Sequence, residues 1–467
     1  MIPRTKQFKK ELPQHLKNRV MRENIARAAW LSVQKRNERV AEIPEWEELR
    51  EKASRIKREV IEHLWENLDI FQENAGKRGI EVFRAADAAE ANRLAEDIAR
   101  KHGIKRIAKS KSMLTEEIGF NDYMQEKGLE VVETDLGEYI IQLAGEAPSH
   151  LTAPALHKSR REIGRLFQEK LNVPYSENPE ELTALARQVL REKFLAADMG
   201  VTGANFGIIE SGQIVVVENE GNARMCAALP NVHLAFIGIE RLIPRVYDLD
   251  LFLTLLCRSA TGQKITSFVS LINGPRPPHA YDGPEKVYYI LVDNRRSSFL
   301  QDEQLKQALY CIRCGACYNV CPVYQNIGGH AYGWVYQGPI GAVITPQLLG
   351  LPEAKDLPFA SSLCGACSET CPVKIPLHRL LLYQRRRIVE ESLSAGVEKA
   401  AFKVFAALAR SPKLFAAPGR WIGRLQRLLP LQLRAPGWSK SRELPQPAKQ
   451  TFREWWGKDA DGVIHGR

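Results

Sequence analysis

Seven of the nine cysteines in this chain lie in one short segment, between Cys311 and Cys371. They form two strings, and each string ends in Cys-Pro. The first string is Cys311, Cys314, Cys317 and Cys321, and the second is Cys364, Cys367 and Cys371. The spacing of the first string, Cys-x2-Cys-x2-Cys-x3-Cys-Pro, is that of bacterial ferredoxins. The segment is therefore predicted to fold around iron–sulfur clusters.

In the ferredoxin pattern the fourth cysteine of a string binds the other cluster. The crossed assignment gives Cys311, Cys314, Cys317 and Cys371 to a first cluster, and Cys321, Cys364 and Cys367 to a second. Both strings share Cys-Gly-Ala-Cys-x3-Cys-Pro-Val, so the segment is an internal repeat, in which Gly315 and Gly365 let the backbone approach the cluster. The competing interpretation is a zinc ribbon. A zinc site needs only four ligands, however, and would not explain the additional cysteine that precedes proline in each string.

The second cluster is one thiolate short. The register of the first string places Ser361 where the eighth cysteine would stand. A [4Fe–4S] cluster could take the Ser361 oxygen, water or a group from a partner, and a [3Fe–4S] cluster needs only three thiolates. A distant side chain could also complete the set, the candidates being Cys226, Cys257, His330 and His378. We predict two [4Fe–4S] clusters, the second with a fourth ligand other than cysteine.

Hydrophobic periodicity and turn residues divide the chain into four predicted parts. These are a helical N-terminal extension (1–75), an α/β domain with a mixed sheet (76–295), an α-helical, ferredoxin-like two-cluster domain (296–391) and a basic helical C-terminal region (392–467). The predicted strands cover 80–83, 106–108, 130–132, 139–143, 206–210, 213–218, 232–237 and 287–292, and Ser211-Gly212 is predicted to turn a hairpin. Helices are expected over 87–101 and 377–391.

Most of the net charge of +11 belongs to one stretch, 399–442, which has ten basic residues and no acidic one. This local patch argues against a general nucleic-acid binder. Within it Trp421, Leu425 and Leu428 share a helical face, which indicates docking onto protein or, alternatively, onto an anionic membrane surface. With no signal peptide, no apolar run of about 18 residues and cysteines kept reduced, we expect a cytoplasmic protein, or one peripheral at the inner face of the membrane.

Polar residues of the α/β domain could line a second site. Lys109-Ser110-Lys111-Ser112 lies between a predicted strand and a predicted helix, where anions collect, and His157-Lys158, Thr202-Gly203 and 218–224 could close around it. The alternative is that both lysines are solvated and that Gly221-Asn222 is a turn. No dinucleotide-binding Gly-x-Gly-x-x-Gly loop follows a strand, and the sequence assigns no catalytic residue.

Several longer stretches carry a family resemblance. Those at 109–113 (Lys-Ser-Lys-Ser-Met), 115–119, 133–142 and 218–222 resemble the LUD domain of lactate utilisation proteins. Those at 328–330 (Gly-Gly-His), 338–342 and 437–439 (Gly-Trp-Ser) are similar to the iron–sulfur B component of the same group. The chain thus resembles the lactate utilisation protein B family, whose LUD fold is similar to the isomerase and CoA-transferase superfamily.

The resemblance implies an iron–sulfur subunit of a bacterial system that oxidises L-lactate to pyruvate. It also implies two partners, a cysteine-rich redox protein and a second LUD protein, and it agrees with the crossed assignment of ligands. In one alternative the chain is still an electron-transfer subunit, but it serves another substrate, either a different 2-hydroxy acid or a disulfide. In a second alternative the LUD domain is an isomerase- or transferase-type enzyme with the clusters as sensors.

Overall fold

The computed structural model describes residues 3–394, 396–415 and the single positions 417, 421, 452, 455 and 456. The chain divides into two units, Met1–Glu391 and Ser392–Arg467. In the second unit α19 (Gly396–Ala409) is a helix with no buried residue. The predicted face of Trp421, Leu425 and Leu428 lies outside the described residues, apart from Trp421 alone. None of the helices in the described ranges is long and apolar enough to span a membrane.

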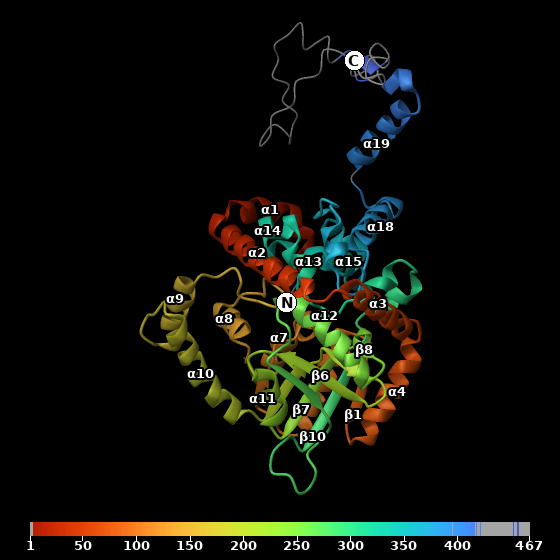
Figure 1. Ribbon diagram of the computed structural model, residues 1–467. Helices are drawn as coiled ribbons and strands as arrows, with labels where there is room; N and C mark the ends of the chain where they lie inside the picture. Colours follow the sequence, from red (N-terminus) through yellow and green to blue (C-terminus); the bar gives the residue numbers. More distant parts are fainter. Residues whose placement is uncertain are drawn as a thin grey trace. The chain divides into compact units, whose positions relative to one another are not determined.

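The first unit is built on a six-stranded sheet, shown in Figure 1. Its order is β1-β10-β7-β4-β2-β3, and every neighbouring pair is parallel. The strands are β1 (Glu81–Ala85), β2 (Arg106–Lys109), β3 (Glu130–Glu133), β4 (Met199–Gly203), β7 (Val232–Gly238) and β10 (Lys286–Val292). The predicted mixed sheet is thus divided in two. These six strands form a wholly parallel sheet, because long crossovers that contain helices join them, and the antiparallel pairs lie in a second, mixed sheet.

The central strands β7 and β10 are buried on both faces, as their unbroken apolar sequences require. Along β7, Leu234 and Phe236 pack on one side with α5 (Ala88–Lys101), while Ala235 and Ile237 pack on the other side with α12 (Leu249–Thr261). The alternation follows from the two-residue period of a strand. Two helical layers therefore enclose the sheet and leave its carboxyl end for a site.

A second, smaller sheet has the order β8-β5-β6-β9. Its strands are β5 (Phe206–Ile208), β6 (Gln213–Glu218), β8 (Leu242–Ile243) and β9 (Phe268–Ile272). The predicted hairpin is confirmed, since β5 and β6 are antiparallel, but its loop spans 209–212 rather than two residues. Gly212 has a φ of 69°, and a Cβ there would lie 2.1 Å from the backbone nitrogen of Ala75. Only glycine fits this close approach to helix α4 (Leu64–Lys77).

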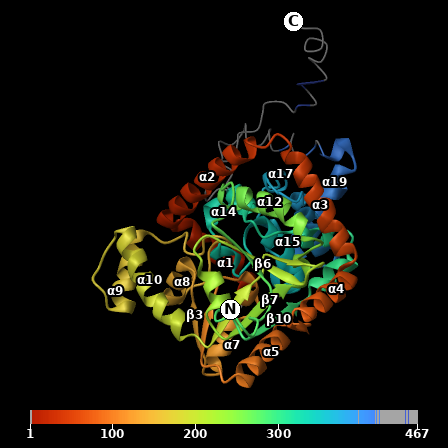
Figure 2. The same cartoon turned by 60° about the horizontal axis from the view of Figure 1, so that its bottom comes forward.

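The predicted strand at 139–143 is wrong, because these residues lie in α8 (Leu136–Ala144). Asp135 accepts a hydrogen bond from the backbone of Glu138 and caps the helix, and Gly145 ends it in the left-handed conformation. Residues Tyr139, Ile140 and Ile141 are all buried, and a short apolar run of this kind does not distinguish a buried helix from a strand. Figures 1 and 2 show α8 beside α9 (Arg160–Leu171) and α10 (Pro179–Ala196).

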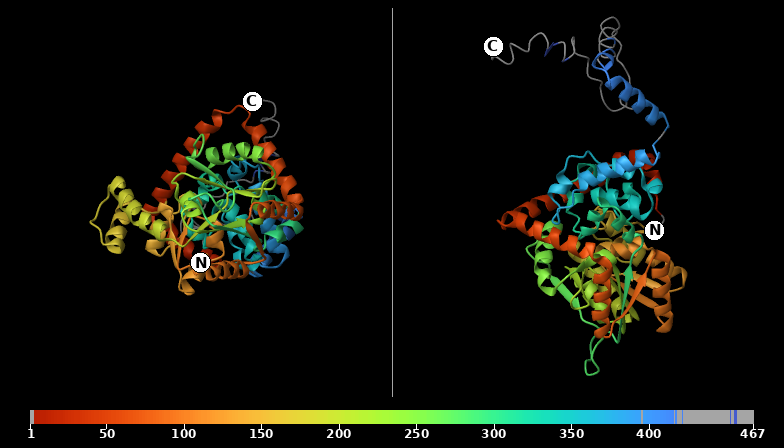
Figure 3. Two further views of the ribbon diagram at one scale, coloured as in Figure 1. Left: turned by 90° about the horizontal axis from the view of Figure 1, so that it is seen from below. Right: turned by 90° about the vertical axis from the view of Figure 1, so that its right-hand side faces the viewer.

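The remaining helices confirm a helical N-terminus and a helical cluster segment. They are α1 (Phe8–Lys17), α2 (Arg19–Ala41), α3 (Trp46–Glu62), α4 (Leu64–Lys77), α6 (Met113–Glu117), α7 (Phe120–Glu126), α11 (Asn222–Ala228), α13 (Ala316–Asn319), α14 (Pro322–Ile327), α15 (Gly338–Leu348), α16 (Leu351–Ala354), α17 (Ala366–Glu369) and α18 (Leu377–Glu390). Figure 3 shows α2 and α3, in red and orange, running along the cluster segment, and α2 packs against α12, α13 and α14. One hydrophobic core contains residues of the N-terminal helices, the α/β part and the cluster segment. The domain boundaries predicted between these parts therefore stay a prediction.

Candidate iron–sulfur sites

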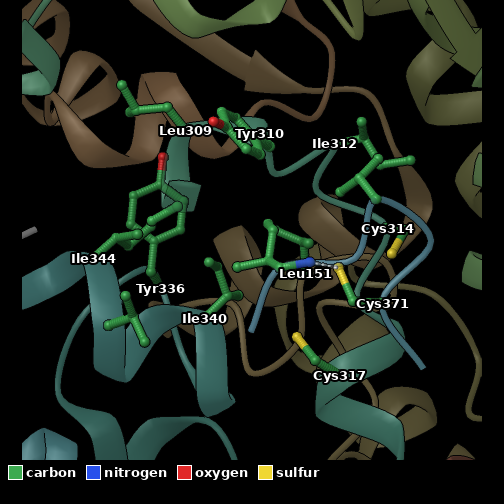
Figure 4. Packing of buried hydrophobic residues seen from close by; sticks show 14 of the residues in the cluster. Leu151, Leu309, Tyr310, Ile312, Cys314, Cys317, Tyr336, Ile340, Ile344 and Cys371 are labelled. Carbon is green, nitrogen blue, oxygen red and sulfur yellow. Dashed lines mark hydrogen bonds between the residues drawn. The ribbon is translucent and has the colours of Figure 1, made fainter. Parts of the chain in front are cut away.

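Four cysteines from both strings surround one enclosed cavity of about 20 Å³. Cys311, Cys314, Cys317 and Cys371 line it, together with apolar residues such as Leu151 and Ile340. Figure 4 shows three of these cysteines close together in the core. We call this group the first cluster site. Because Cys371 joins three cysteines of the other string, the arrangement fits the crossed assignment, which stays a prediction.

The sequence repeat is also a repeat of the backbone. Arg313 and Leu363, which precede the matching cysteines Cys314 and Cys364, have φ values of 58° and 56°. Gly315 and Gly365 follow those cysteines with φ values of 76° and 87°, and each begins a single-turn helix, α13 or α17. This conformation favours glycine and turns the next cysteine back toward the first.

Backbone amides point at the sulfurs of the first cluster site. The amide of Arg313 donates to Cys311 Sγ at 3.4 Å, and the amide of Ile375 donates to Cys371 Sγ at 3.4 Å. Burial raises the pKa of the Cys314 and Cys317 thiols, and burial raises that of Cys371 to about 11. Thiols in such surroundings become ligands only when a metal displaces their protons. Among the described residues that line this cavity, the four cysteines are the side chains that can bind a metal, and such a thiolate set suits iron–sulfur chemistry.

Helix α3 fastens the second string to the rest of the chain. The guanidinium of Arg50, which is 7% exposed, donates to the carbonyl of Cys371 at 2.8 Å and to that of Glu369 at 2.6 Å. On the opposite string, Arg241 donates to the carbonyl of Cys311 at 3.2 Å. These cations lie beside a site where several thiolates would gather negative charge, so they stabilise it electrostatically.

The remaining three cysteines form a second group, which we call the second cluster site. Cys321 and Cys367 are buried, whereas Cys364 is exposed. Burial first, and then the nearby Cys321, raises the pKa of the Cys367 thiol to about 11, with Cys364 adding to the effect. These three sulfurs are therefore electrostatic neighbours, as the crossed assignment requires.

The candidates for a fourth ligand of the second site are each engaged elsewhere. Ser361 Oγ accepts from the amide of Leu363 at 3.1 Å. His330 Nε2 lies 2.7 Å from the carbonyl of Ala147, and His378 Nδ1 lies 2.7 Å from Ser368 Oγ. Cys226 packs in a separate apolar cluster with Ala108 and Tyr139, and Cys257 lines a polar pocket of the α/β part. Both histidines thus have hydrogen-bond partners within the protein, and the fourth ligand of the second site stays a prediction.

That polar pocket, of about 330 Å³, lies at the carboxyl ends of β2, β4 and β7. The structure brings together much of the predicted anion site here, namely Ser110, Lys111, Ser112, Gly203, Glu218, Asn219, Glu220, Asn222 and Ala223. His157 and Lys158 are not part of it. They lie in a different cavity, where both contact Glu146 at 2.7 Å, so their predicted place around the anion site is wrong.

Lys109 is also not an anion ligand, because it is fully buried and paired. Its Nζ lies 2.7 Å from Glu133 and 3.3 Å from Glu116. Burial raises the pKa of the Glu133 carboxyl to about 7 although Lys109 opposes the shift, and burial also raises that of Glu138. At Glu133 and Glu138, burial thus outweighs the opposing effect of the nearby lysines on the pKa.

Sequence comparisons agree with these observations. Three family models match: the LUD domain over residues 68–292, the 4Fe-4S dicluster domain over 307–375, and the C-terminal part of lactate utilisation protein B over 384–460. Lactate utilization protein B of Shouchella clausii is 45% identical over 96% of both chains. That of Bacillus subtilis is 43% identical over 97% of this chain and 96% of its own. This chain belongs to the lactate utilization protein B family.

Family membership confirms the predicted fold class, a LUD α/β domain followed by a 4Fe-4S dicluster domain. A solved DUF162 family protein from Deinococcus radiodurans covers 49% of this chain at 15% identity, with a TM-score of 0.28, which is too low to add to the argument. All seven clustered cysteines lie inside the dicluster match. The chain is therefore an iron–sulfur protein of lactate utilisation.

The sequence did not point to the arginines between the LUD domain and the cluster segment. Arg296 pairs with Glu117 at 2.7 Å and with Glu240 at 2.8 Å, and all three are buried. Arg313 stacks on Tyr336 with its guanidinium 4.5 Å from the ring centre. The one available signal was Arg313 itself, since its place between Cys311 and Cys314 puts it beside the first cluster site.

Proposed function

We propose that this chain is the electron-transfer subunit of a multi-component system that oxidises L-lactate to pyruvate. The observation that carries the proposal is the adjacency of two cysteine groups, one in the core and one that reaches the surface at Cys364. Bound [4Fe–4S] clusters would supply one-electron transfer, with four cysteines for the first and three for the second. Lactate oxidation releases two electrons, and two such centres can take them one at a time.

The chain's own residues support this role. Cys314, Cys317 and Cys371 of the first site are buried, which limits the access of water, while Arg50 holds the loop of Cys371 in place. The exposed Cys364 leaves an edge of the second site open to another protein. The proposed partners are the two further lactate utilisation components, the cysteine-rich redox protein and the second LUD protein, with a quinone-linked acceptor at the inner membrane face beyond them.

Growth of a deletion strain tests the proposal. The gene is deleted in its own host, growth on L-lactate is compared with growth on glucose, and the strain is complemented with the wild type, Cys314→Ser or Cys364→Ser. We expect loss of growth on L-lactate alone, restored by the wild type and by neither variant. Rescue by a variant that lacks a cluster would show that electron transfer is not the role, and normal growth of the deletion strain on lactate would contradict the substrate.

A further inference from the structure

The polar pocket of the LUD domain faces the first cluster site. Its floor is the carboxyl end of three neighbouring strands, β2, β4 and β7, which is where parallel α/β sheets bind their ligands. Its opposite wall includes Arg313 and Tyr336 from the cluster segment. Arg313 also lines the cavity of the first cluster site. A molecule in this pocket could therefore contact the loop between Cys311 and Cys314 directly, through Arg313.

One end of the pocket holds more positive than negative charge. Three guanidinium groups, those of Arg241, Arg296 and Arg313, line this end. Glu117 and Glu240 are the paired carboxylates, and both are engaged by Arg296 at 2.7 and 2.8 Å. Three guanidinium groups against two carboxylates leave one positive charge, which a bound anion would share with the thiolates of the first cluster site beside Arg241.

Arg313 has a buried donor to spare. Arg313 reaches Glu240 only at 3.4 Å, and its Nη1 is buried without a hydrogen-bond partner in the part of the chain that the structure describes. Arg241 is 8% exposed, donates to the carbonyl of Cys311 and lies over the ring of Phe206, and within the described residues it forms no ion pair. A buried donor without a partner costs about 1–3 kcal/mol, which a bound anion would recover.

The other end of the pocket is rich in hydrogen-bond acceptors. Asp135 caps α8 and faces Lys111 at 3.5 Å, Glu220 accepts from the amide of Leu136, and Glu218 accepts from the first turn of α11. Carboxylates have further lone pairs with which to accept a hydroxyl proton. They also repel a ligand that carries several negative charges, such as phosphate. This end therefore suits a neutral hydroxyl group.

We propose that this pocket binds a small 2-hydroxycarboxylate, with its carboxylate on Arg313 and Arg241 and its hydroxyl toward Asp135 and Glu220. The inference rests on the proposed function and adds to it a place for the substrate, in the same chain as the clusters and beside the first of them. The volume of about 330 Å³ admits a molecule of this size without opening the core. Arg313 and Arg241 act as binding residues, and no chemical step is assigned to them.

The test is equilibrium binding to the full-length protein with its clusters assembled under anaerobic conditions. Isothermal titration calorimetry compares L-lactate with propionate, which lacks the hydroxyl, and with inorganic phosphate. The variants are Arg313→Gln and the milder Arg241→Lys. The matched control is Arg36→Gln, which removes a guanidinium that donates to the carbonyl of Thr370 next to Cys371 but does not line the pocket. Iron content and absorption spectra establish that each variant keeps its clusters.

We expect L-lactate to bind more tightly than propionate or phosphate. Loss of a charge-assisted hydrogen bond should raise the Kd for L-lactate at least about tenfold in Arg313→Gln. Arg241→Lys should raise it less, and Arg36→Gln should leave it unchanged. An intact protein that takes up no L-lactate overturns the inference, and so does an equal effect of Arg313→Gln and Arg36→Gln. Phosphate binding as tightly as L-lactate overturns the choice of a hydroxycarboxylate.

These outcomes are separable from those of the growth experiment. If the deletion strain loses growth on L-lactate while the purified protein binds none, the electron-transfer role stands and only this pocket assignment fails. If L-lactate binds in an Arg313-dependent way while the deletion strain grows normally on lactate, the pocket assignment stands and the proposed function fails.

Discussion

The first cluster site lies inside the hydrophobic core, whereas the second ends at the surface. Cys314, Cys317 and Cys371 of the first site are each 7–8% exposed and belong to the same core as the LUD sheet, and Cys311 is partly exposed. In the second site Cys321 and Cys367 are equally buried in that core, but Cys364 is exposed. Yet both sites contain the same repeated sequence and the same backbone turn, at Gly315 in one and Gly365 in the other. Their difference therefore comes from what packs around them, and not from the motifs themselves.

Other parts of the chain supply those surroundings. The first site is enclosed by Leu151 of the LUD domain, by Ile340 of α15 and by the turn that Arg50 holds from α3. Around Gly315 the neighbours are His150 and Thr152, whereas none of the residues that the structure describes lies within 4 Å of a Cβ built at Gly365. A repeat can thus provide two equivalent ligand loops, and the fold makes one of them interior and the other accessible to partners.

Replacing one ligand in each site should give the largest contrast. Cys314→Ser should remove the first cluster and destabilise the whole unit, because metal binding contributes directly to folding and a hydroxyl would be left in the core. Cys364→Ser should remove the second cluster, leave the first reducible and lower the Tm much less. Iron content, electron paramagnetic resonance spectra and thermal unfolding measure the three effects.

Cys367→Ser is the control for this comparison, because it changes a buried ligand of the second site. It should also spare the spectrum of the first cluster. If Cys364→Ser or Cys367→Ser abolished both spectroscopic signals while the protein stayed folded, the division into two separate ligand sets would be wrong. Equal losses of Tm for Cys314→Ser and Cys364→Ser would contradict the expectation that the exposed Cys364 contributes less to the core than the buried Cys314.

Exposure to a chelator should give a smaller but clear difference between the sites. Water and small reagents reach the second site through Cys364, whereas apolar side chains enclose the first. Iron from the second cluster should therefore be lost several times faster under mild oxidation in the presence of a water-soluble chelator. The time course of both spectroscopic signals checks this, and simultaneous loss of the two would mean that the enclosure of the first site does not protect it.

The sequence predicted those features that depend on local spacing. Cys311 and its neighbours, the hairpin of β5 and β6, and the helix α18 all follow from motifs or periodicity that a few residues define. The strand expected at 139–143 failed because a buried helix and a buried strand share a short apolar run. The helix α9 could have been predicted, since Ser159 and Glu162 form a capping box at its start.

Long-range pairing was the part that the sequence could not supply. Lys109 looked like a free anion ligand, yet the structure buries it against Glu133, a residue of the neighbouring strand. The arginine network of Arg296, Glu117 and Glu240 joins three separate segments, and no spacing rule connects them. Such contacts depend on how the elements pack, which single-residue patterns do not record.

The smallest effect is expected at Ser361, the position that corresponds to the eighth cysteine. Its Oγ accepts from the amide of Leu363, and its carbonyl accepts from Arg385 at 2.8 Å, so the residue shapes the turn before Cys364. Ser361→Ala should cost about 1 kcal/mol or less and leave the iron content unchanged. Ser361→Cys, the matched variant, should alter the spectrum of the second cluster and not that of the first. Loss of iron in Ser361→Ala would instead identify this hydroxyl as the fourth ligand, and the two sites would then differ in the type of their ligands as well as in their exposure.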